Sequence, residues 1–410
     1  MTMDNKRQNT SKKTNRNYSD PSYRDVKLAD REACTGCGAC VEVCKRGAII
    51  FERMDEGFYY PFIRTNLCIK CKKCEKVCPV MNDQISLGLE GTFIFQHSNK
   101  MDLMNSSSGG AFIALARSIL QSGGLVYGCS FSPDFKTVEH VRVSNINELI
   151  KIQKSKYLQS RANQHFCRIK EELSNNHLVL FSGTPCQIHA LKGYLGKDFE
   201  NLLTCAIVCH GVPSEMVWQS YIRELEIHYK SSLISYDFRD KSYGWHDYSV
   251  RAIFLNGKVY SVSHLDDPYM KCYLNNYSLR SSCYNCLFSG RRCGADILMG
   301  DAWSIEKKNE VLDTTKGITR IWVFSNKGIF YVKKMKKLDT SLIKTETELF
   351  EDRDMIRVPI NRDAFFVDID HELAFSKVLK KYVKDPLVIS VKRKIKFWMK
   401  KILSNVISER

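Results

Sequence analysis

Eight cysteines between Cys34 and Cys78 constrain this chain more than any other feature of its sequence. They form two runs with the same spacing, Cys-x2-Cys-x2-Cys-x3-Cys, and a proline follows the second run. A tight loop with a cysteine at every third position supplies three thiolates to one cubane 4Fe–4S cluster, and the fourth cysteine reaches the other cluster. The spacing therefore predicts two clusters, one held by Cys34, Cys37, Cys40 and Cys78 and the other by Cys68, Cys71, Cys74 and Cys44.

Two zinc sites are the alternative, because zinc also binds four cysteines. The repeated triple spacing and the terminal Cys-Pro favour a bacterial-type dicluster ferredoxin module over zinc. Gly36 and Gly38 suit the tight first loop, where backbone amides can point at cluster sulfurs. The stretch between the runs predicts a hairpin that turns at Asp55–Gly57.

The whole chain of 410 residues contains 17 cysteines, an odd number that a pure disulfide framework would avoid. Its first residues are polar and basic without an apolar core, so no secretory signal is expected. No apolar run approaches the ~18 residues of a membrane span. We therefore expect a cytoplasmic metal or redox protein. A net charge of +17 suits acidic partner proteins, anionic membranes or polyanionic ligands.

The pattern along the chain predicts four parts. Residues 1–28 are a polar, basic tail, residues 29–84 the ferredoxin module, residues 85–385 a larger domain, and residues 386–410 a separate C-terminal segment. In the larger domain, apolar strands alternate with amphipathic helices. This mixture predicts an α/β or α+β domain with one large mixed sheet. The expected strands are 92–97, 125–131, 138–143, 178–181, 203–208, 234–238, 249–254, 259–263, 296–299 and 321–325, and the expected helices are 109–121, 161–174, 185–195 and 213–229.

Residues 386–410 combine an apolar stripe with seven basic residues and one acidic residue, a net charge of +6. This pattern is typical of a basic amphipathic helix. One interpretation is a helix docked on the protein; the other is contact with an acidic partner or peripheral contact with the inner face of a membrane.

Three later cysteine segments predict a further metal centre. Cys186 and Cys209 each follow an expected strand, at the sheet edge where α/β proteins bind ligands, and Cys283-x2-Cys286 supplies a pair. We expect these four to hold a third 4Fe–4S cluster. In the alternatives, Cys186 is catalytic, some of the four are buried thiols, or Cys293 replaces one of them. Apolar surroundings predict that four other cysteines are core residues: Cys129, Cys167, Cys205 and Cys272.

Nucleotide-binding motifs are absent from the sequence. It contains neither GxGxxG nor GxxxxGK[ST], so a standard Rossmann or P-loop site has no support, and the Cys-x3-Cys-x2-Cys pattern of radical enzymes is missing. The basic residues form no recognisable nucleic-acid-binding module. A serine–glycine turn over residues 105–110 precedes an expected helix and could bind an anion or a polar ring.

Taken together, the motifs resemble the family of coenzyme F420 hydrogenase/dehydrogenase beta subunits over roughly residues 30–330. The resemblance rests on the two ferredoxin runs and on seven short segments: Ser107–Gly110, Lys154–Tyr157, Gly183–Gln187, Cys209–Pro213, Cys283–Cys286, Ala295–Trp303 and Lys316–Gly317. Cys293 and the basic C-terminal segment stand outside the family pattern.

The resemblance implies an iron–sulfur flavoprotein in which the α/β domain binds FAD. Members of the family oxidise or reduce a deazaflavin coenzyme, reduce chlorophyll intermediates, or join larger redox complexes. Carried over to this sequence, the residues expected to contact FAD are Ser107, Ser108, Gly109, Gly110, Lys156 and Tyr157, with Asp301 and Lys316 near it.

Two functions from different classes follow. The favoured one is a flavin-dependent oxidoreductase that moves electrons between its ferredoxin clusters and an organic small-molecule substrate, with ferredoxin or another low-potential donor as partner. A flavin suits this role because clusters carry single electrons, whereas organic substrates usually exchange two. The alternative is a non-catalytic electron-transfer subunit of a larger complex.

Overall fold

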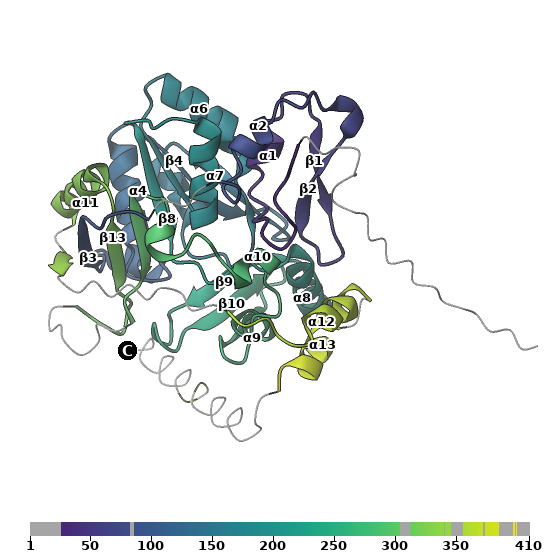
Figure 1. Ribbon diagram of the computed structural model, residues 1–410. Coiled ribbons are helices and arrows are strands. Elements are labelled where there is room, and N and C mark those ends of the chain that lie inside the picture. Colours follow the sequence, from purple (N-terminus) through teal and green to yellow (C-terminus); the bar gives the residue numbers. More distant parts are fainter. Residues whose placement is uncertain are drawn as a thin grey trace, which may run out of the picture.

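The computed structural model describes residues 26–82, 86–303, 312–339, 341–345, 356–371 and 374–384, together with Phe397 and Met399. Figure 1 shows a small cysteine-rich module, in purple, beside a larger α/β body. None of the helices in these ranges is long and apolar enough to cross a membrane. Residues 1–25 of the tail and nearly all of the basic C-terminal segment lie outside the described residues. The Phe397 ring lies 4.9 Å from that of Tyr243.

The cysteine-rich module is a pseudo-repeat around one hairpin. Strands β1 (Ile49–Arg53) and β2 (Tyr59–Ile63) pair antiparallel and turn at Asp55–Gly57 as predicted. Gly57 has a φ of 78°, which suits glycine in this turn. Each cysteine run ends in one helical turn, and the short helices are α1 (Ala39–Glu42), η1 (Thr65–Leu67) and α2 (Lys73–Lys76).

A nine-stranded mixed sheet forms the large domain, in the order β14-β3-β13-β12-β8-β7-β4-β5-β6. Its centre, from β12 to β4, is parallel, and the β3, β13 and β14 side is antiparallel. Parallel strands are buried on both faces, which explains their unbroken apolar runs. The strands are β3 (Gly91–Phe95), β4 (Leu125–Phe131), β5 (Val138–Val143), β6 (Ser160–Arg161), β7 (Val179–Gly183), β8 (Leu202–Ile207), β12 (Ile297–Asp301), β13 (Thr319–Val323) and β14 (Leu342–Thr345).

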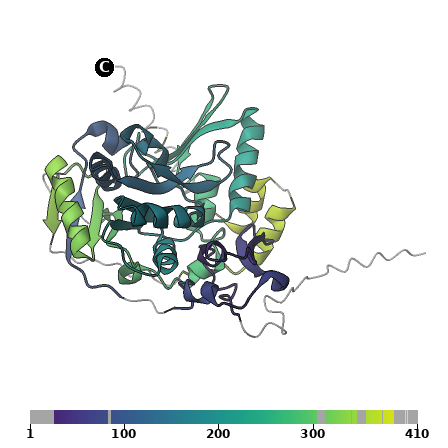
Figure 2. The same cartoon turned by 90° about the horizontal axis from the view of Figure 1, so that it is seen from above.

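Helices cover both faces of this sheet (Figures 1 and 2). Helices α4 (Ala111–Gln121) and α11 (Asn326–Leu338) share one apolar core with the sheet, and α6 (Phe166–Ser174) and α7 (Pro185–Leu195) share the other. Helix α7 begins where predicted, because Thr184 and Gln187 form a capping box and Pro185 occupies the first turn. The shorter helices are α3 (Lys100–Met104), η2 (Ile146–Glu148), α5 (Leu149–Ile152) and η3 (Asn163–His165).

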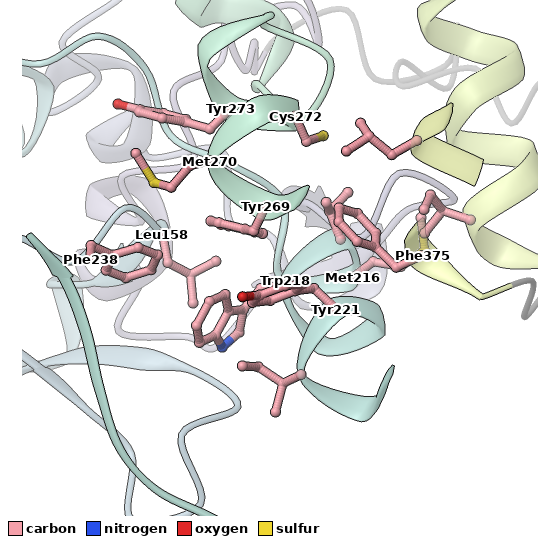
Figure 3. Close-up of a cluster of buried hydrophobic side chains, with 14 of the residues drawn as sticks. Leu158, Met216, Trp218, Tyr221, Phe238, Tyr269, Met270, Cys272, Tyr273 and Phe375 are labelled. Carbon is pink, nitrogen blue, oxygen red and sulfur yellow. The ribbon is translucent and has the colours of Figure 1, made fainter. Parts of the chain in front are cut away.

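A second sheet corrects the expectation of one large sheet. Strands β9 (Leu233–Asp240), β10 (Ser249–Phe254) and β11 (Val259–Ser263) pair only with one another. They separate because their buried face packs on α8 in an aromatic core around Trp218, Tyr221 and Tyr269 (Figure 3). This core also receives helices from late in the chain: α8 (Glu215–Tyr229), α9 (Pro268–Leu274), α10 (Ser281–Tyr284), α12 (Arg362–Asp370) and α13 (Phe375–Tyr382), with η4 (Gly290–Arg292) nearby in sequence.

The cysteine-rich module is joined to the body by close packing. A Cβ atom at Gly57 would lie 2.5 Å from the Cβ of Met216, so the hairpin turn rests directly on the start of α8. Arg362 donates two hydrogen bonds to the Glu56 carboxylate, at 2.9 and 2.8 Å, and a third to the Leu279 carbonyl. These contacts fix the module relative to the loop that carries Cys283.

Candidate functional site: cysteine clusters and a polar strand-end site

The first predicted cysteine set lines one cavity of the small module. Cys34, Cys37 and Cys40 come from the first run, and Cys78 comes from the end of the second. Gly36 and Gly38 line the same cavity with φ of 66° and 77°, so the loop bends as only glycine does easily. Desolvation raises the pKa of the Cys37 thiol to about 11. A bound metal would favour the thiolate form of such a buried group, and the donor set fits an iron–sulfur cluster.

Three members of the second predicted set also lie close together. Cys44, from the end of the first run, packs with Cys68 and Cys74 of the second in one small apolar cluster around Val26. The remaining member, Cys71, is exposed. Among the described residues, no three His, Cys, Asp or Glu side chains converge closely enough to share a single metal ion.

Arg280 links the first cavity to the body and was not singled out by the sequence. Its side chain is fully buried and donates to the Cys34 carbonyl at 2.7 Å, the Tyr59 carbonyl at 2.9 Å and Gln159 Oε1 at 3.2 Å. A Cβ at Gly36 would lie 2.6 Å from the guanidinium. Arg280 also lies three residues before Cys283, and its carbonyl accepts the Cys283 N–H at 2.9 Å. The only feature of the sequence that could have indicated this role is the position of Arg280 three residues before a predicted cluster ligand, Cys283.

The structure brings the four later cysteines into one neighbourhood. Electrostatic interactions connect Cys186 with Cys209, Cys283 and Cys286, and burial raises the Cys186 pKa well above its ordinary value. Thr184 Oγ1 lies 3.2 Å from Cys186 Sγ, and the Val212 N–H donates to Cys283 Sγ at 3.4 Å. Cys186 lies in the first turn of α7, just after β7, and Cys209 follows β8, as the strand-end argument predicts. Cys283 lies in α10, and Cys286 follows that helix.

The remaining cysteines differ in how deeply they are buried. Cys293 is buried and interacts electrostatically with Cys205. Cys205 and Cys272 are buried core residues as predicted, and Cys129 is half-buried. Cys167 is exposed, so its core prediction was wrong: it lies on the outer side of α6, whose buried stripe is formed by Phe166, Ile169 and Leu173.

The serine–glycine turn lies against the sheet. Ser108 Oγ donates to the Ile318 carbonyl, and the Gly109 N–H donates to Thr319 Oγ1, both at 2.9 Å. A Cβ at Gly109 would lie 2.1 Å from the Phe95 carbonyl oxygen, so this position must be glycine. Gly110 caps α4 with a φ of 87°. The Gly109 amide is therefore hydrogen-bonded within the protein, and in this structure the turn serves to join α4 to the sheet.

The Lys154–Tyr157 segment meets this turn. Ser107 Oγ accepts the Ser155 N–H at 2.8 Å. The amine of the half-buried Lys156 donates to the Lys151 carbonyl in α5 and to the carbonyls of Gln153 and Lys154. Any influence of Lys156 on a ligand would therefore act through the shape of this loop. Lys316 is more remote: its amine pairs with Asp313 at 2.7 Å and is 45% exposed.

A polar site with unsatisfied groups lies where β9 and β12 end. Arg239 Nη1 donates to Asp301 Oδ2 at 2.9 Å and to the Tyr157 hydroxyl at 3.3 Å. Arg239 Nε and Nη2 and Asp301 Oδ1 are buried without a hydrogen-bond partner within the described structure. Buried polar groups are normally paired, so these atoms point to a ligand. Tyr157 and Asp301 were singled out by resemblance, whereas Arg239 was missed; its signal was a cation within a strand.

Aromatic and basic groups surround this pair. The Arg239 guanidinium lies 4.3 Å from the Tyr248 ring centroid and 5.3 Å from that of Trp303, and Trp303 stacks on Trp245 at 4.3 Å. Lys241 donates to the carbonyls of Leu103, Ser108 and Lys316. Burial, with the nearby charges of Arg239 and Lys154, lowers the Lys241 pKa to about 7. Segments far apart in sequence thus meet at one polar, aromatic-walled site.

Comparison with known proteins gives two matches to domain families. Residues 33–82 match a 4Fe-4S dicluster domain, and residues 176–348 match the family described as the C terminus of the coenzyme F420 hydrogenase/dehydrogenase beta subunit. The first match covers both cysteine runs, and the second covers Cys186, Cys209, Cys283, Cys286 and the Arg239–Asp301 pair.

Individual proteins are similar over parts of the chain. An uncharacterized ferredoxin of Methanocaldococcus jannaschii is 40% identical over 52 residues, which are 13% of this chain and 66% of that protein. The F subunit of the F(420)H(2) dehydrogenase of Methanosarcina mazei is 21% identical over 176 residues, 41% of this chain and 50% of that protein. The chain thus spans less than two thirds of either relative.

One solved structure is similar over a wider span. It is a chain of the F420-reducing [NiFe] hydrogenase complex from Methanosarcina barkeri, with 16% identity and a TM-score of 0.45. The similarity covers 72% of this chain and 93% of that one.

Proposed function

We propose that this chain, in which residues 176–348 match the family of coenzyme F420 hydrogenase/dehydrogenase beta subunits and residues 33–82 match a 4Fe-4S dicluster domain, is an iron–sulfur flavoprotein oxidoreductase. It passes electrons between its ferredoxin-type clusters and FAD, and on to an organic substrate or a deazaflavin-like coenzyme. A ferredoxin or another low-potential carrier is its electron partner. The observation that carries the proposal is the continuous connection from the first cysteine cavity to the Cys283 loop through Arg280.

The order of the centres follows from these contacts. The first cavity and the Cys186 set are joined by one buried side chain, so a third cluster at Cys186, Cys209, Cys283 and Cys286 would stand between the ferredoxin module and the α/β body. The fully buried guanidinium of Arg280 excludes water from this junction and holds the Cys34 loop at a fixed position. A rigid, dry junction keeps the separation of two redox centres constant.

The strand-end site supports the flavin part of the proposal. FAD supplies the conversion between one-electron and two-electron transfer when it is bound. Here the free N–H groups of Arg239 would donate to ring carbonyls and the free Asp301 oxygen would accept a ring N–H. Trp303 offers a flat, 44% exposed ring beside them. The serine–glycine turn and the Lys154–Tyr157 loop form one connected frame around this site.

The metal content tests the third cluster. Anaerobically purified protein should contain about twelve iron atoms if all three clusters are present, and about four fewer in a Cys283→Ser/Cys286→Ser variant. The ferredoxin signal should persist in that variant. A Cys129→Ser/Cys167→Ser variant is the matched control and should keep all its iron. Unchanged iron in the first variant would overturn the assignment of a third cluster.

Flavin content tests the strand-end site. Denatured protein should release about one FAD per chain, and Arg239→Gln should lower this content more than Arg251→Gln, which changes an arginine of the neighbouring strand β10. Lys156→Ala should also weaken flavin binding more than Lys258→Ala, which changes an exposed residue. The Lys156 substitution removes the amine whose hydrogen bonds to backbone carbonyls hold the loop in shape. An unchanged FAD content in both Arg239→Gln and Lys156→Ala would overturn the assignment of the flavin to the strand-end site.

A non-catalytic electron-transfer subunit is the second candidate function. It is favoured by the similarity to a protein that is named as part of a dehydrogenase. The two candidates differ in the isolated chain: an oxidoreductase contains flavin and oxidises or reduces a small molecule, whereas a transfer subunit only relays electrons. A substrate screen with the isolated chain separates them. The oxidised chain is tested with reduced deazaflavin as electron donor, and the reduced chain with oxidised deazaflavin and flavin analogues as acceptors.

A further inference from the structure

We propose that the outer surface of the second cysteine run docks an acidic, one-electron carrier protein, on a lysine face formed by Lys45, Arg46, Arg64, Lys70, Lys72, Lys73 and Lys76. This inference rests on the proposed function, because it gives the electron partner a place and a charge. All seven side chains are exposed. On docking, the reduced carrier loses one electron and the protein gains it, and no atoms are exchanged.

The backbone of the second run directs these lysines outward. Lys70 and Lys72 have φ of 57° and 58°, a left-handed conformation that non-glycine residues adopt rarely. Cys68, Cys74 and Val77 turn toward the interior, while the lysines between the cysteines face solvent. The same loop that would hold the cluster therefore builds a positively charged exterior around it.

The face has an apolar centre next to an exposed ligand. Ile69 is 63% exposed, and its neighbour in the run, Cys71, is exposed as well. A second cluster would therefore lie close to the surface at this point, which suits transfer to a bound carrier. Exposed apolar groups rimmed by charge are typical of protein–protein contact sites.

Charge on this face is almost wholly positive. Glu75 is the only acidic residue between Arg64 and Lys76, and its carboxylate accepts the backbone N–H of Lys27 at 2.8 Å. Ion pairs within the described structure do not involve Lys72, Lys73 or Lys76. A concentrated positive face accelerates the encounter with an acidic protein and holds it weakly, as turnover of a carrier requires.

Charge reversal tests the face. The variant Lys72→Glu/Lys73→Glu/Lys76→Glu changes three exposed positions around the second run. The matched control, Lys333→Glu/Lys336→Glu/Lys377→Glu, makes the same change of net charge on α11 and α13, and α11 lies on the opposite side of the molecule from the module (Figures 1 and 2). Iron content and the visible spectrum confirm that both variants keep their clusters.

The measurement is binding of an oxidised, acidic bacterial two-cluster ferredoxin at low salt, by titration. The first variant should bind at least tenfold more weakly than the parent and the control within about twofold, and raising the salt should shrink the difference because screening weakens exposed charges. Zero-length coupling of lysines to carboxylates should join the ferredoxin to the peptide containing Lys72 and Lys73. If the charge reversal disturbs the clusters, Lys72→Gln/Lys73→Gln/Lys76→Gln replaces it with a smaller expected loss.

Several outcomes would overturn the docking face. The first is equal ferredoxin binding by the parent and the first variant. The second is an equal loss of binding in the control, which would show an effect of total charge. The third is a loss of binding to anionic vesicles in the first variant while its ferredoxin binding stays intact, which would show that the face binds a membrane. Reduction of bound flavin by dithionite through the clusters is measured on the same variants. If the flavin of the parent is not reduced, the proposed function is contradicted, while the measured ferredoxin binding still tests the docking face.

Discussion

At the scale of single residues, buried cations hold the functional parts together. Arg280 and Arg239 are both almost inaccessible, yet they differ in the use of their nitrogens. The donors of Arg280 are engaged by the Cys34 loop, the Tyr59 carbonyl and Gln159, whereas Arg239 keeps two nitrogens without partners in the described structure. The first arginine therefore positions protein groups, and the second has capacity for a ligand.

Replacement of Arg280 should affect both stability and redox behaviour. Arg280→Gln leaves buried carbonyls without donors, at a cost of roughly 1–3 kcal/mol for each. It also removes a positive charge beside the first cluster, so the reduction potential of that cluster should fall. A redox titration followed by electron paramagnetic resonance measures the shift, and Arg280→Lys should restore part of it. An unchanged potential in Arg280→Gln, with the exposed Arg64→Gln as control, would contradict this role.

His140 should make the protein sensitive to acid. It is buried, its Nε2 donates to the Ser182 carbonyl at 2.8 Å, and burial lowers its pKa from 6.5 to about 4. Between these two values the unfolded chain binds more protons than the folded one, so stability falls as the pH falls below 6.5.

The loss attributable to His140 should be about 1.4 kcal/mol per pH unit within that window. Anaerobic urea unfolding at pH 7.5 and 5.5 measures it. The midpoint of the parent should fall more between the two pH values than that of His140→Gln. Parallel falls in the two proteins would show that His140 does not cause the acid sensitivity.

At the scale of elements, the turn between α3 and α4 depends on the close approach of its backbone to the sheet. Gly109 packs against the carbonyl of Phe95 and the Thr319 N–H of the neighbouring strand β13, where no Cβ fits. Overpacking of such a site typically costs about 1–3 kcal/mol. Gly109→Ala should therefore lower the melting temperature by several degrees and weaken flavin retention, because the same turn contacts the Ser155 loop.

A matched glycine provides the control for this loop. Gly88 is exposed, and a Cβ added there would have no atom within 4 Å, so Gly88→Ala should melt like the parent. Scanning calorimetry of the two variants compares them directly. Equal melting temperatures for the parent and both variants would mean that the α3–α4 turn can move away from the sheet.

At the scale of the whole molecule, the ferredoxin module and the body should unfold together. Buried arginines from the body reach into the module at Cys34 and Glu56, and its hairpin turn rests on α8. All five tryptophans lie after residue 200, outside the module, so their fluorescence reports on the body. Most of the cluster absorbance comes from the two ferredoxin-type clusters and therefore reports on the module.

These two signals should change at the same denaturant concentration in the parent, because coincident transitions mark cooperative unfolding. Arg362→Met removes the paired donors to Glu56 and should separate the two curves, with the cluster signal lost first. Two distinct transitions in the parent would show that the module is an independent unit.

Consecutive residues were enough to predict the local parts of this protein. Cysteine spacing predicted a set of four cysteines whose members line one cavity, the turn at Asp55–Gly57 was inferred from its residues, and strands β4, β5, β10 and β11 and helix α7 have the predicted bounds. These features depend on short-range geometry, periodicity and capping, which neighbouring residues specify among themselves.

Tertiary packing was needed to determine which distant segments meet. It separated β9–β11 from the main sheet, placed Cys293 near Cys205, and placed Arg280 beside Cys34 across 246 residues of sequence. It also joined Arg239, Asp301 and Tyr157 into one polar site. The sequence around a buried arginine does not identify its partner. The hydrogen bonds that stabilise the buried cation form only when the chain has folded.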